Sequence, residues 1–211
     1  KRKAGADFAG LDHPLARAFQ AYLSGQRASA ILLFEEAQKV FPELEEPYEI
    51  LAKLAGLDGR YDDAEAWLSQ GIKADRGYIP YWSGRGKAKS DRAVKLYWTG
   101  KDPSPTLLSG IEDWQTALKL DPGNAHLWRM VAQSYSNIGI SRQNQERPDV
   151  ETLEKGVLAF QESLRIDPTA VAGWEGMGGC NNNLARALLS LGRDPSGPWL
   201  AAIDNFSEAI K

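Results

Sequence analysis

The chain has few of the residues from which catalytic and metal sites are usually built. Its 211 residues include two histidines and one cysteine. The histidines, His13 and His126, are far apart in the sequence, and His13 precedes a proline. Zinc sites need clustered cysteine and histidine at defined spacing, and enzymes need nucleophiles, acids, bases or metal ligands that converge. The sequence therefore predicts no catalytic residue, no metal and no cofactor, and we expect the chain not to be an enzyme.

Long apolar runs and a strong charge of one sign are also missing. No stretch approaches the roughly 18 consecutive apolar residues of a membrane-spanning helix, and no charged-then-apolar leader precedes the repeats. The net charge of −3 argues against a general nucleic-acid binder, which usually carries a basic patch. We therefore expect neither nucleic acid nor a membrane as a partner. The start at Lys1-Arg2-Lys3 and the stop inside a repeat indicate a fragment of a longer chain.

The single cysteine, Cys180, has no partner for an intrachain disulfide. A lone cysteine fits a reducing compartment, so we expect a cytoplasmic location. We expect the thiol itself to belong to a small buried residue in a helix rather than to a reactive nucleophile.

Internal repetition is what the chain has in abundance. Trp82, Trp128 and Trp174 are 46 residues apart, and Asp121-Pro122 is followed at the same interval by Asp167-Pro168. Self-similarity at a fixed period is typical of a solenoid, in which each repeat buries its apolar face only against its neighbours. This organisation favours a binding surface over a catalytic centre.

Each repeat is predicted to contain two helices. Apolar residues recur on one face at helical spacing from Leu107 to Leu120. Asp121-Pro122 ends this helix, because proline disfavours the helical conformation in the residue before it. Asn124 is a suitable N-cap for the next helix, which is predicted to run from Ala125 past Tyr135.

The family resemblance follows from the string Trp128-Arg-Met-Val131-Ala132-Gln-Ser-Tyr135, which is followed by a second helix with Phe160 and then Pro168. It resembles the tetratricopeptide repeat, a helix–turn–helix unit of 34 residues. The turn glycines Gly25 and Gly59 show that the first two repeats keep that shorter period. The resemblance implies an all-α, right-handed superhelical solenoid of antiparallel helix pairs, forming one domain over residues 1–211. Its five repeats are expected at about 11–44, 45–78, 79–124, 125–170 and 171–211, the last one truncated.

The three later repeats each carry twelve further residues between their two helices. Apolar positions continue at helical spacing into this insert, for example at Leu96 and Leu188. We therefore predict ordered helices over 78–98, 125–145 and 171–191, with both helices of each hairpin lengthened by about one to two turns.

The seven tryptophans divide into two groups. Five occupy repeat-defining positions, where we expect them in the core: Trp82, Trp114, Trp128, Trp174 and Trp199. Trp128→Ala should therefore lower the melting temperature strongly. Trp67 and Trp98 lie off those positions and are expected to be surface aromatics.

Polar residues fall on the open side of the first helices when Trp82, Trp128 and Trp174 face the core. In tetratricopeptide proteins this side lines a concave face, where ligands commonly lie as extended peptides. The resulting candidate groove comprises Lys53, Ser83, Lys87, Arg129, Gln133, Asn137, Glu175, Asn182 and Asn183. Gly176 and Gly179 either allow close backbone packing or open room for the backbone of a ligand. The amide cluster 181–183 either anchors a peptide or only solvates a helix surface.

The resemblance favours a non-catalytic interaction module or scaffold that presents a concave groove to a protein or peptide partner. One alternative is a regulatory or sensory segment of a larger signalling enzyme, such as a bacterial serine/threonine kinase. Another is a self-assembly module, in which the uncapped last repeat associates with a second copy. The sequence does not identify the partner.

Overall fold

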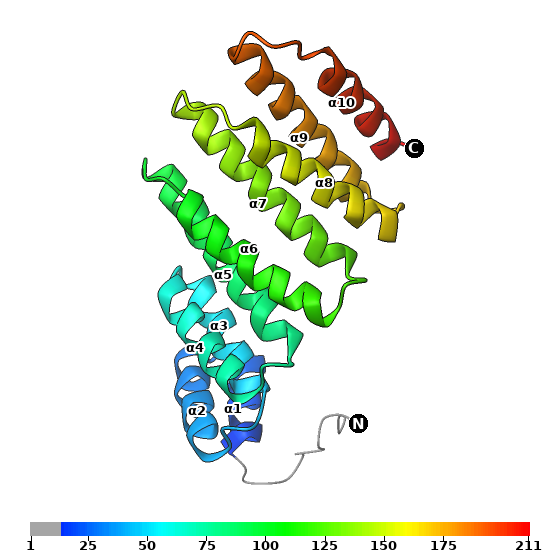
Figure 1. Ribbon diagram of the computed structural model, residues 1–211. Coiled ribbons are helices and arrows are strands. Elements are labelled where there is room, and N and C mark those ends of the chain that lie inside the picture. Colours follow the sequence, from blue (N-terminus) through cyan, green and yellow to red (C-terminus); the bar gives the residue numbers. More distant parts are fainter. Residues whose placement is uncertain (1–13) are drawn as a thin grey trace. The chain divides into compact units, whose positions relative to one another are not determined.

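The computed structural model describes residues 14–211, and these residues form helices joined by turns, with no β-strand among them (Figure 1). The predicted all-α helical solenoid is thus confirmed. The ten helices of this range are α1 (Pro14–Leu23), α2 (Arg27–Val40), α3 (Glu46–Leu57), α4 (Tyr61–Ala74), α5 (Ile79–Trp98), α6 (Ser104–Leu120), α7 (Ala125–Asn144), α8 (Val150–Ile166), α9 (Val171–Ser190) and α10 (Ser196–Ala209). His13 and the predicted start of the first repeat near residue 11 lie outside the described residues.

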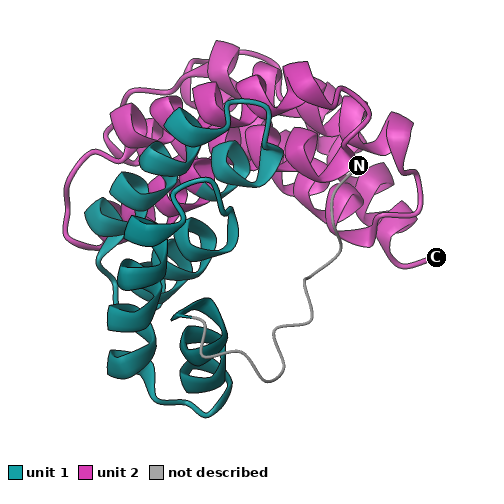
Figure 2. Cartoon of the chain, turned by 90° about the horizontal axis from the view of Figure 1, so that it is seen from below, with its two compact units in different colours: residues 1–84 teal, residues 85–211 magenta. Residues whose placement is uncertain are grey.

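Contacts divide the chain into two compact units, residues 1–84 and residues 85–211, which we call the N-terminal and C-terminal units (Figure 2). The division falls inside α5, between Gly84 and Arg85. Three expectations stay predictions: a single domain over 1–211, the bounds of the five repeats, and the right-handed sense of the solenoid.

A small apolar core joins the first helices of the N-terminal unit. Leu15 and Ala18 of α1 pack with Ala30 and Phe34 of α2, and all four side chains are buried. The Phe19 ring meets the Phe34 ring edge-on at 5.2 Å between centroids. The alanines let the two helix backbones approach closely while Phe34 fills the space between them.

In the described residues, each turn that follows the first helix of a pair contains one residue with a left-handed backbone, two residues after the helix ends. These residues are Gly25, Gly59, Gly100, Glu146 and Gly192, with φ angles of 73°, 71°, 74°, 57° and 68°. Glycine takes this conformation without the clash that a Cβ atom causes, which is why it commonly ends helices. The turn between α7 and α8 therefore carries backbone strain, at Glu146, that the other four turns do not have.

The first helices of the C-terminal pairs are long. Helices α5, α7 and α9 have 20 residues each, against 12 for α3. The predicted helices over 78–98, 125–145 and 171–191 are therefore confirmed. No helix within residues 14–211 is long and apolar enough to cross a membrane.

The second helices gain much less than predicted. Helices α6 and α8 have 17 residues, whereas α10 has 14, the same length as α4. The prediction of one to two extra turns was wrong for these helices, because three residues make less than one turn. The reason lies in the prolines and aspartates at 102–103, 148–149 and 194–195, which hold the chain in turns and caps before the second helix begins.

The tryptophans of the first helices are not the central core residues that the sequence predicted. Trp82, Trp128 and Trp174 are half-buried, and the fully buried positions are the residues just before them, such as Tyr81 and Leu127. Successive residues of an α-helix point about 100° apart, so the side chain that faces the core is the one before the tryptophan. Each indole N–H instead donates to a carbonyl six residues earlier, those of Arg76, Pro122 and Pro168, at 2.9, 3.1 and 2.9 Å. Each of these hydrogen bonds therefore links the first helix to the turn that precedes it.

Trp67 of α4, expected at the surface, is half-buried against the core of α1 and α2, so that expectation was wrong. The other two second-helix tryptophans behave in opposite ways. Trp114 on α6 is 1% exposed and is a core residue, as predicted. Trp199 on α10 is 38% exposed, so its predicted place in the core was wrong. The physical reason is that no described helix follows α10, whereas α7 and α9 cover the corresponding sides of α6 and α8.

Candidate functional site

A hollow with a volume of about 410 Å³ lies between α7 and α9 of the C-terminal unit. Helix α7 contributes polar side chains one turn apart, at Arg129, Gln133 and Asn137, because residues four apart share a helix face. Helix α9 contributes the polar side chains of Glu175 and Asn183, with Gly179 between them on the same face. We call this hollow the polar pocket; its remaining lining residues are Ser136, Ile140, Phe160, Ala172, Gly176 and Cys180.

The polar pocket brings together five of the nine predicted groove residues: Arg129, Gln133, Asn137, Glu175 and Asn183. Asn182 is exposed and lies outside the lining. Lys87, on α5 of the same unit, also lies outside it and pairs with Asp91 at 2.6 Å.

The two remaining predicted residues, Lys53 and Ser83, belong to the N-terminal unit. The Lys53 ammonium lies 6.0 Å from the centre of the Tyr22 ring, and the Ser83 hydroxyl donates to the Pro80 carbonyl at 3.2 Å. Both contacts are local to that unit. The groove assignment of all nine residues stays a prediction.

The glycines of α9 have different surroundings. A Cβ atom on Gly176 would come within 2.4 Å of the Phe160 ring, and one on Gly178 within 2.8 Å of the Phe206 ring. Close packing therefore explains these two glycines. A Cβ atom on Gly179 would meet nothing within 4 Å. Packing therefore does not explain Gly179, although glycine there costs the helix about 1 kcal/mol relative to alanine. Because it has no side chain, Gly179 leaves the polar pocket open on the side of α9.

The amide cluster of α9 also separates into different roles. Asn181 is buried, and its side-chain N–H donates to the Met177 carbonyl of its own helix at 3.2 Å. Asn183 is half-buried and lines the polar pocket. Of the three consecutive asparagines, Asn181 is structural, Asn182 faces solvent and Asn183 borders the pocket.

The charges of the polar pocket are balanced, with one cation at Arg129 and one anion at Glu175. The Arg129 guanidinium donates to Nδ1 of His126 at 2.8 Å, since arginine has only donors. Burial, and then the charge of Arg129, lower the pKa of His126, so this imidazole is neutral near pH 7 and can accept. The three amides of Gln133, Asn137 and Asn183 can each donate and accept hydrogen bonds.

Cys180 lies at the floor of the polar pocket as a structural residue. Its side chain is fully buried, as predicted, and its thiol donates to the Leu153 carbonyl at 3.4 Å. Burial raises the pKa of this thiol to about 11, so it is protonated and poorly nucleophilic near pH 7. Within residues 14–211 no group of histidine, cysteine or acidic side chains is arranged to hold a metal ion.

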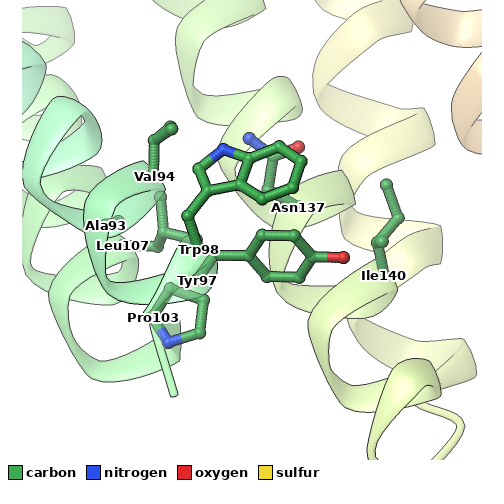
Figure 3. Close-up of a pocket in the computed structure, with 8 residues that line it drawn as sticks. All are labelled: Ala93, Val94, Tyr97, Trp98, Pro103, Leu107, Asn137 and Ile140. Carbon is green, nitrogen blue, oxygen red and sulfur yellow. The ribbon is translucent and has the colours of Figure 1, made fainter. Parts of the chain in front are cut away.

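A second, smaller hollow of about 220 Å³ lies beside the first, between the end of α5, the start of α6 and α7 (Figure 3). We call it the aromatic pocket; its lining consists of Ala93, Val94, Tyr97, Trp98, Pro103, Leu107, Asn137 and Ile140. Asn137 and Ile140 line both pockets. The sequence identified Trp98 as a surface aromatic but did not predict this pocket. Its signal was available in the repeat register, since the residues 46 positions after Tyr97 and Trp98 are Gln143 and Asn144.

Comparison with known proteins gives a fold but no close relative. No protein family model matches the chain, and no curated protein matches its sequence. The solved structure "MamA 41-end from Desulfovibrio magneticus RS-1" matches with a TM-score of 0.64 at 15% identity, covering 98% of this chain and 96% of that one.

Two solved tetratricopeptide (TPR) proteins match as well. YrrB, described as a TPR protein with an unusual peptide-binding site, has a TM-score of 0.58 at 14% identity, covering 93% of this chain and 88% of its own. A thermophilic TPR protein of Thermus thermophilus has a TM-score of 0.53 at 19% identity, covering 93% of this chain and 97% of its own. These likenesses confirm a TPR-like repeat fold.

Proposed function

We propose that the C-terminal unit is a non-catalytic interaction module that binds an extended segment of a protein or peptide partner in the polar pocket. The observation that carries the proposal is the placement of Gln133, Asn137 and Asn183 around one hollow on two neighbouring helices. An extended peptide has backbone N–H and C=O groups that lack partners within the peptide itself. Side-chain amides satisfy both kinds of group, so this lining matches a peptide backbone better than a small charged ligand.

Two further observations support the proposal. The open space beside Gly179 lets a backbone approach α9 closely, and packing does not require glycine there. YrrB, which shares the fold, is described as having a peptide-binding site. The exposed residues Lys87 and Asn182 are placed at the margin of the site in this proposal.

A triple substitution tests the polar pocket. Peptides are first selected from a random library on the 211-residue chain, and the affinity of one selected peptide is measured by fluorescence anisotropy. Arg129→Ala, Asn137→Ala and Asn183→Ala together should weaken its binding by roughly a hundredfold or more, because binding energy concentrates in a few central contacts. The melting temperature should change little, since all three side chains lie at the surface of the hollow.

The matched control replaces one arginine and two amides on the exposed sides of the second helices: Gln115→Ala, Gln161→Ala and Arg165→Ala. This control should keep the affinity of the parent chain. Equal affinity of the pocket variant and the parent contradicts the proposal, and so does a library that yields no binding peptide.

A second candidate function is self-assembly through the outer side of α10. In the repeat register, Ile203 and Phe206 correspond to Val157 and Phe160 of α8, yet they are exposed while Phe160 is buried. Exposed apolar surface of this kind marks interaction sites. Light scattering at two protein concentrations tests this candidate: a mass that rises with concentration and falls again on Ile203→Glu supports it, and a constant monomer mass rejects it.

A further inference from the structure

The aromatic pocket is built by residues that the repeat itself does not require. Trp98 is 79% exposed, and Val94 and Tyr97 beside it are exposed too. At the same register, α7 ends in Gln143 and Asn144 and still forms a 20-residue helix. The aromatic pair at the end of α5 is therefore not explained by packing within the helix pairs.

The pocket is held in a defined shape. The Tyr97 hydroxyl accepts a hydrogen bond from the Asn144 side chain at 2.9 Å, which ties the end of α5 to the end of α7. The Trp98 ring stands edge-on to the Tyr97 ring at 5.6 Å. Figure 3 shows Tyr97 pointing toward Ile140 and the indole extending toward Asn137, with Pro103 below. Rotation of the tyrosine is thus restrained before any ligand arrives.

The size and chemistry of the pocket suit one bulky apolar side chain. A dry cavity of about 150 Å³ holds benzene, so a hollow of about 220 Å³ has room for a leucine, phenylalanine or tryptophan side chain. Its polar groups are the Asn137 amide, the Tyr97 hydroxyl and the Trp98 indole N–H, and an apolar hollow with few polar groups is the usual composition of a ligand site. Exposed tryptophan and tyrosine are also the residues that most often dominate binding energy.

The aromatic pocket continues the polar pocket. Asn137 and Ile140 of α7 belong to both linings, so a peptide backbone hydrogen-bonded to Asn137 lies at the entrance of the aromatic pocket. One extended segment can therefore place its backbone in the polar pocket and one side chain in the aromatic pocket.

The charges around Tyr97 and Trp98 indicate which residues flank the bound side chain in the partner peptide. Lys95 and Lys101 flank the pair in sequence, and both are exposed. The nearest carboxylate in sequence, Asp102, accepts a hydrogen bond from the Ser104 N–H at 2.9 Å, at the start of α6. Asp102 keeps its negative charge in this bond, so residues 95–102, which carry the aromatic pair, have two cations and one anion and a net charge of +1, which favours an acidic segment of the partner.

We infer that the occupant of the aromatic pocket is a bulky apolar side chain, flanked by acidic residues, of the same extended peptide that binds the polar pocket. This inference rests on the proposed function and specifies the partner of that site. Library selection on the 211-residue chain should therefore enrich peptides in which leucine, phenylalanine or tryptophan stands beside aspartate or glutamate.

The decisive measurement is a double-mutant cycle with one selected peptide. Trp98→Ala should weaken binding of the parent peptide by about tenfold or more, as truncation of a central aromatic contact does. Replacing the apolar anchor of the peptide by alanine should cause a similar loss, and the two losses should not add. The control is Leu189→Ala, because Leu189 is an exposed apolar residue at the register position of Tyr97 on α9 and lies outside both pockets. This control should bind as the parent does.

The remaining outcomes separate the two proposals. If the polar-pocket triple variant loses binding while Trp98→Ala changes affinity less than about twofold, the proposed function stands and the aromatic pocket is not its anchor site. Additive losses in the cycle overturn the anchor assignment as well. A concentration-dependent dimer that Trp98→Ala dissolves identifies a second copy as occupant, and binding to phosphatidylserine vesicles that Trp98→Ala abolishes identifies a membrane; either result overturns the inference.

Discussion

The short helix pairs of the N-terminal unit and the long pairs of the C-terminal unit fill their interiors differently. The core around α1 and α2 is built of alanine, leucine and phenylalanine, and the ion pair of Arg60 with Asp63 in the same unit is exposed. In the C-terminal unit an ion pair is buried: Asp113 of α6, 4% exposed at its side chain, binds both Arg85 and Lys89 of α5 at 2.6 and 2.7 Å. The interior of this long pair therefore holds paired charges, whereas the core of α1 and α2 is apolar.

The long pairs also differ from the short pairs at the ends of their first helices. The extra turns on α5, α7 and α9 carry side chains beyond the part that defines the repeat, and these side chains differ between pairs. The aromatic pocket lies at one such end. Lengthening the first helix thus creates surface whose residues differ between pairs while each pair keeps a 20-residue first helix.

The largest expected effect comes from removing the centre of a long pair. Trp114→Ala should lower the free energy of unfolding by about 3–5 kcal/mol, because it leaves a cavity where a fully buried indole was. Trp128→Ala should cost about 1–2 kcal/mol, because the indole is half-buried and makes one hydrogen bond. Urea unfolding of both variants measures the difference. An equal or larger cost for Trp128→Ala would restore the sequence-based assignment of Trp128 to the core.

The buried ion pair gives the next effect. Asp113→Asn should destabilise the chain by about 3 kcal/mol or more, since it leaves two cations with little exposure and no carboxylate between them. The control, Asp91→Asn, breaks the exposed pair with Lys87 and should cost less than about 1 kcal/mol. Thermal and urea unfolding of the two variants should differ clearly. If they match, the interior of the long pairs is more hydrated than the contacts indicate.

A smaller, pH-dependent effect is expected at the cap of α8. Asp149 accepts hydrogen bonds from the Thr152 N–H at 3.0 Å and from the Thr152 hydroxyl at 2.6 Å, and it pairs with Arg142. Burial raises the pKa of Asp149, but the bonds from Thr152 and the charge of Arg142 lower it by more, below its ordinary value of 3.8. Because the folded pKa is depressed, the charge stabilises the fold above pH 3.8, and this contribution is lost as the pH falls through the folded pKa.

Asp149→Ala should therefore lower the free energy of unfolding by about 0.5–2 kcal/mol at pH 7, and the difference from the parent should shrink in acid. Asp149→Asn keeps the oxygen that accepts from the Thr152 N–H but cannot titrate and has no second acceptor, so its difference from the wild type measures the charge together with the bonds from the Thr152 hydroxyl and Arg142. Urea unfolding at several pH values checks both. A gap between Asp149→Ala and the parent that does not change with pH would show that the carboxylate charge contributes nothing.

The smallest expected effect is a stabilisation, at the one first-helix turn that lacks glycine. Glu146→Gly should raise the free energy of unfolding by up to about 1 kcal/mol, because glycine relieves the Cβ clash at a φ of 57°. Gly192→Ala, at the equivalent turn after α9, should destabilise by about 1 kcal/mol, since a Cβ there meets no neighbour and only the backbone is strained. A destabilising Glu146→Gly would mean that the glutamate side chain contributes more than the strain costs.

Much of the fold could be predicted because each feature recurs in several repeats of the sequence. The long helices, the turn glycines and the burial of Trp114 all follow from periodic apolar residues and turn signals. The register error at Trp128 arose because a half-buried indole and a fully buried leucine one residue earlier give similar periodic patterns. The exposure of Trp199 could not be inferred from register, because register predicts a partner helix without showing that one is present.

The candidate site was less accessible to sequence reasoning. Gln133, Asn137 and Asn183 were predicted to share a face, and the structure brings them to one hollow. The aromatic pocket was not predicted, because it depends on how Pro103 and Leu107 of one pair meet Ile140 of the next. The repeat register sets Tyr97 and Trp98 apart from Gln143 and Asn144, but it does not show which residues of the next pair they meet, because packing across the stack sets those contacts.

The central claim is that the face between α7 and α9 holds an extended peptide. It is tested most directly by nitrogen–proton NMR of the side-chain amides of the 211-residue chain, titrated with one library-selected peptide. The account predicts shifts of the Gln133, Asn137 and Asn183 amides, with Gln115 and Gln161 on the second helices unchanged. Shifts confined to Gln115 and Gln161, with the three pocket amides unmoved in the saturated complex, would contradict it.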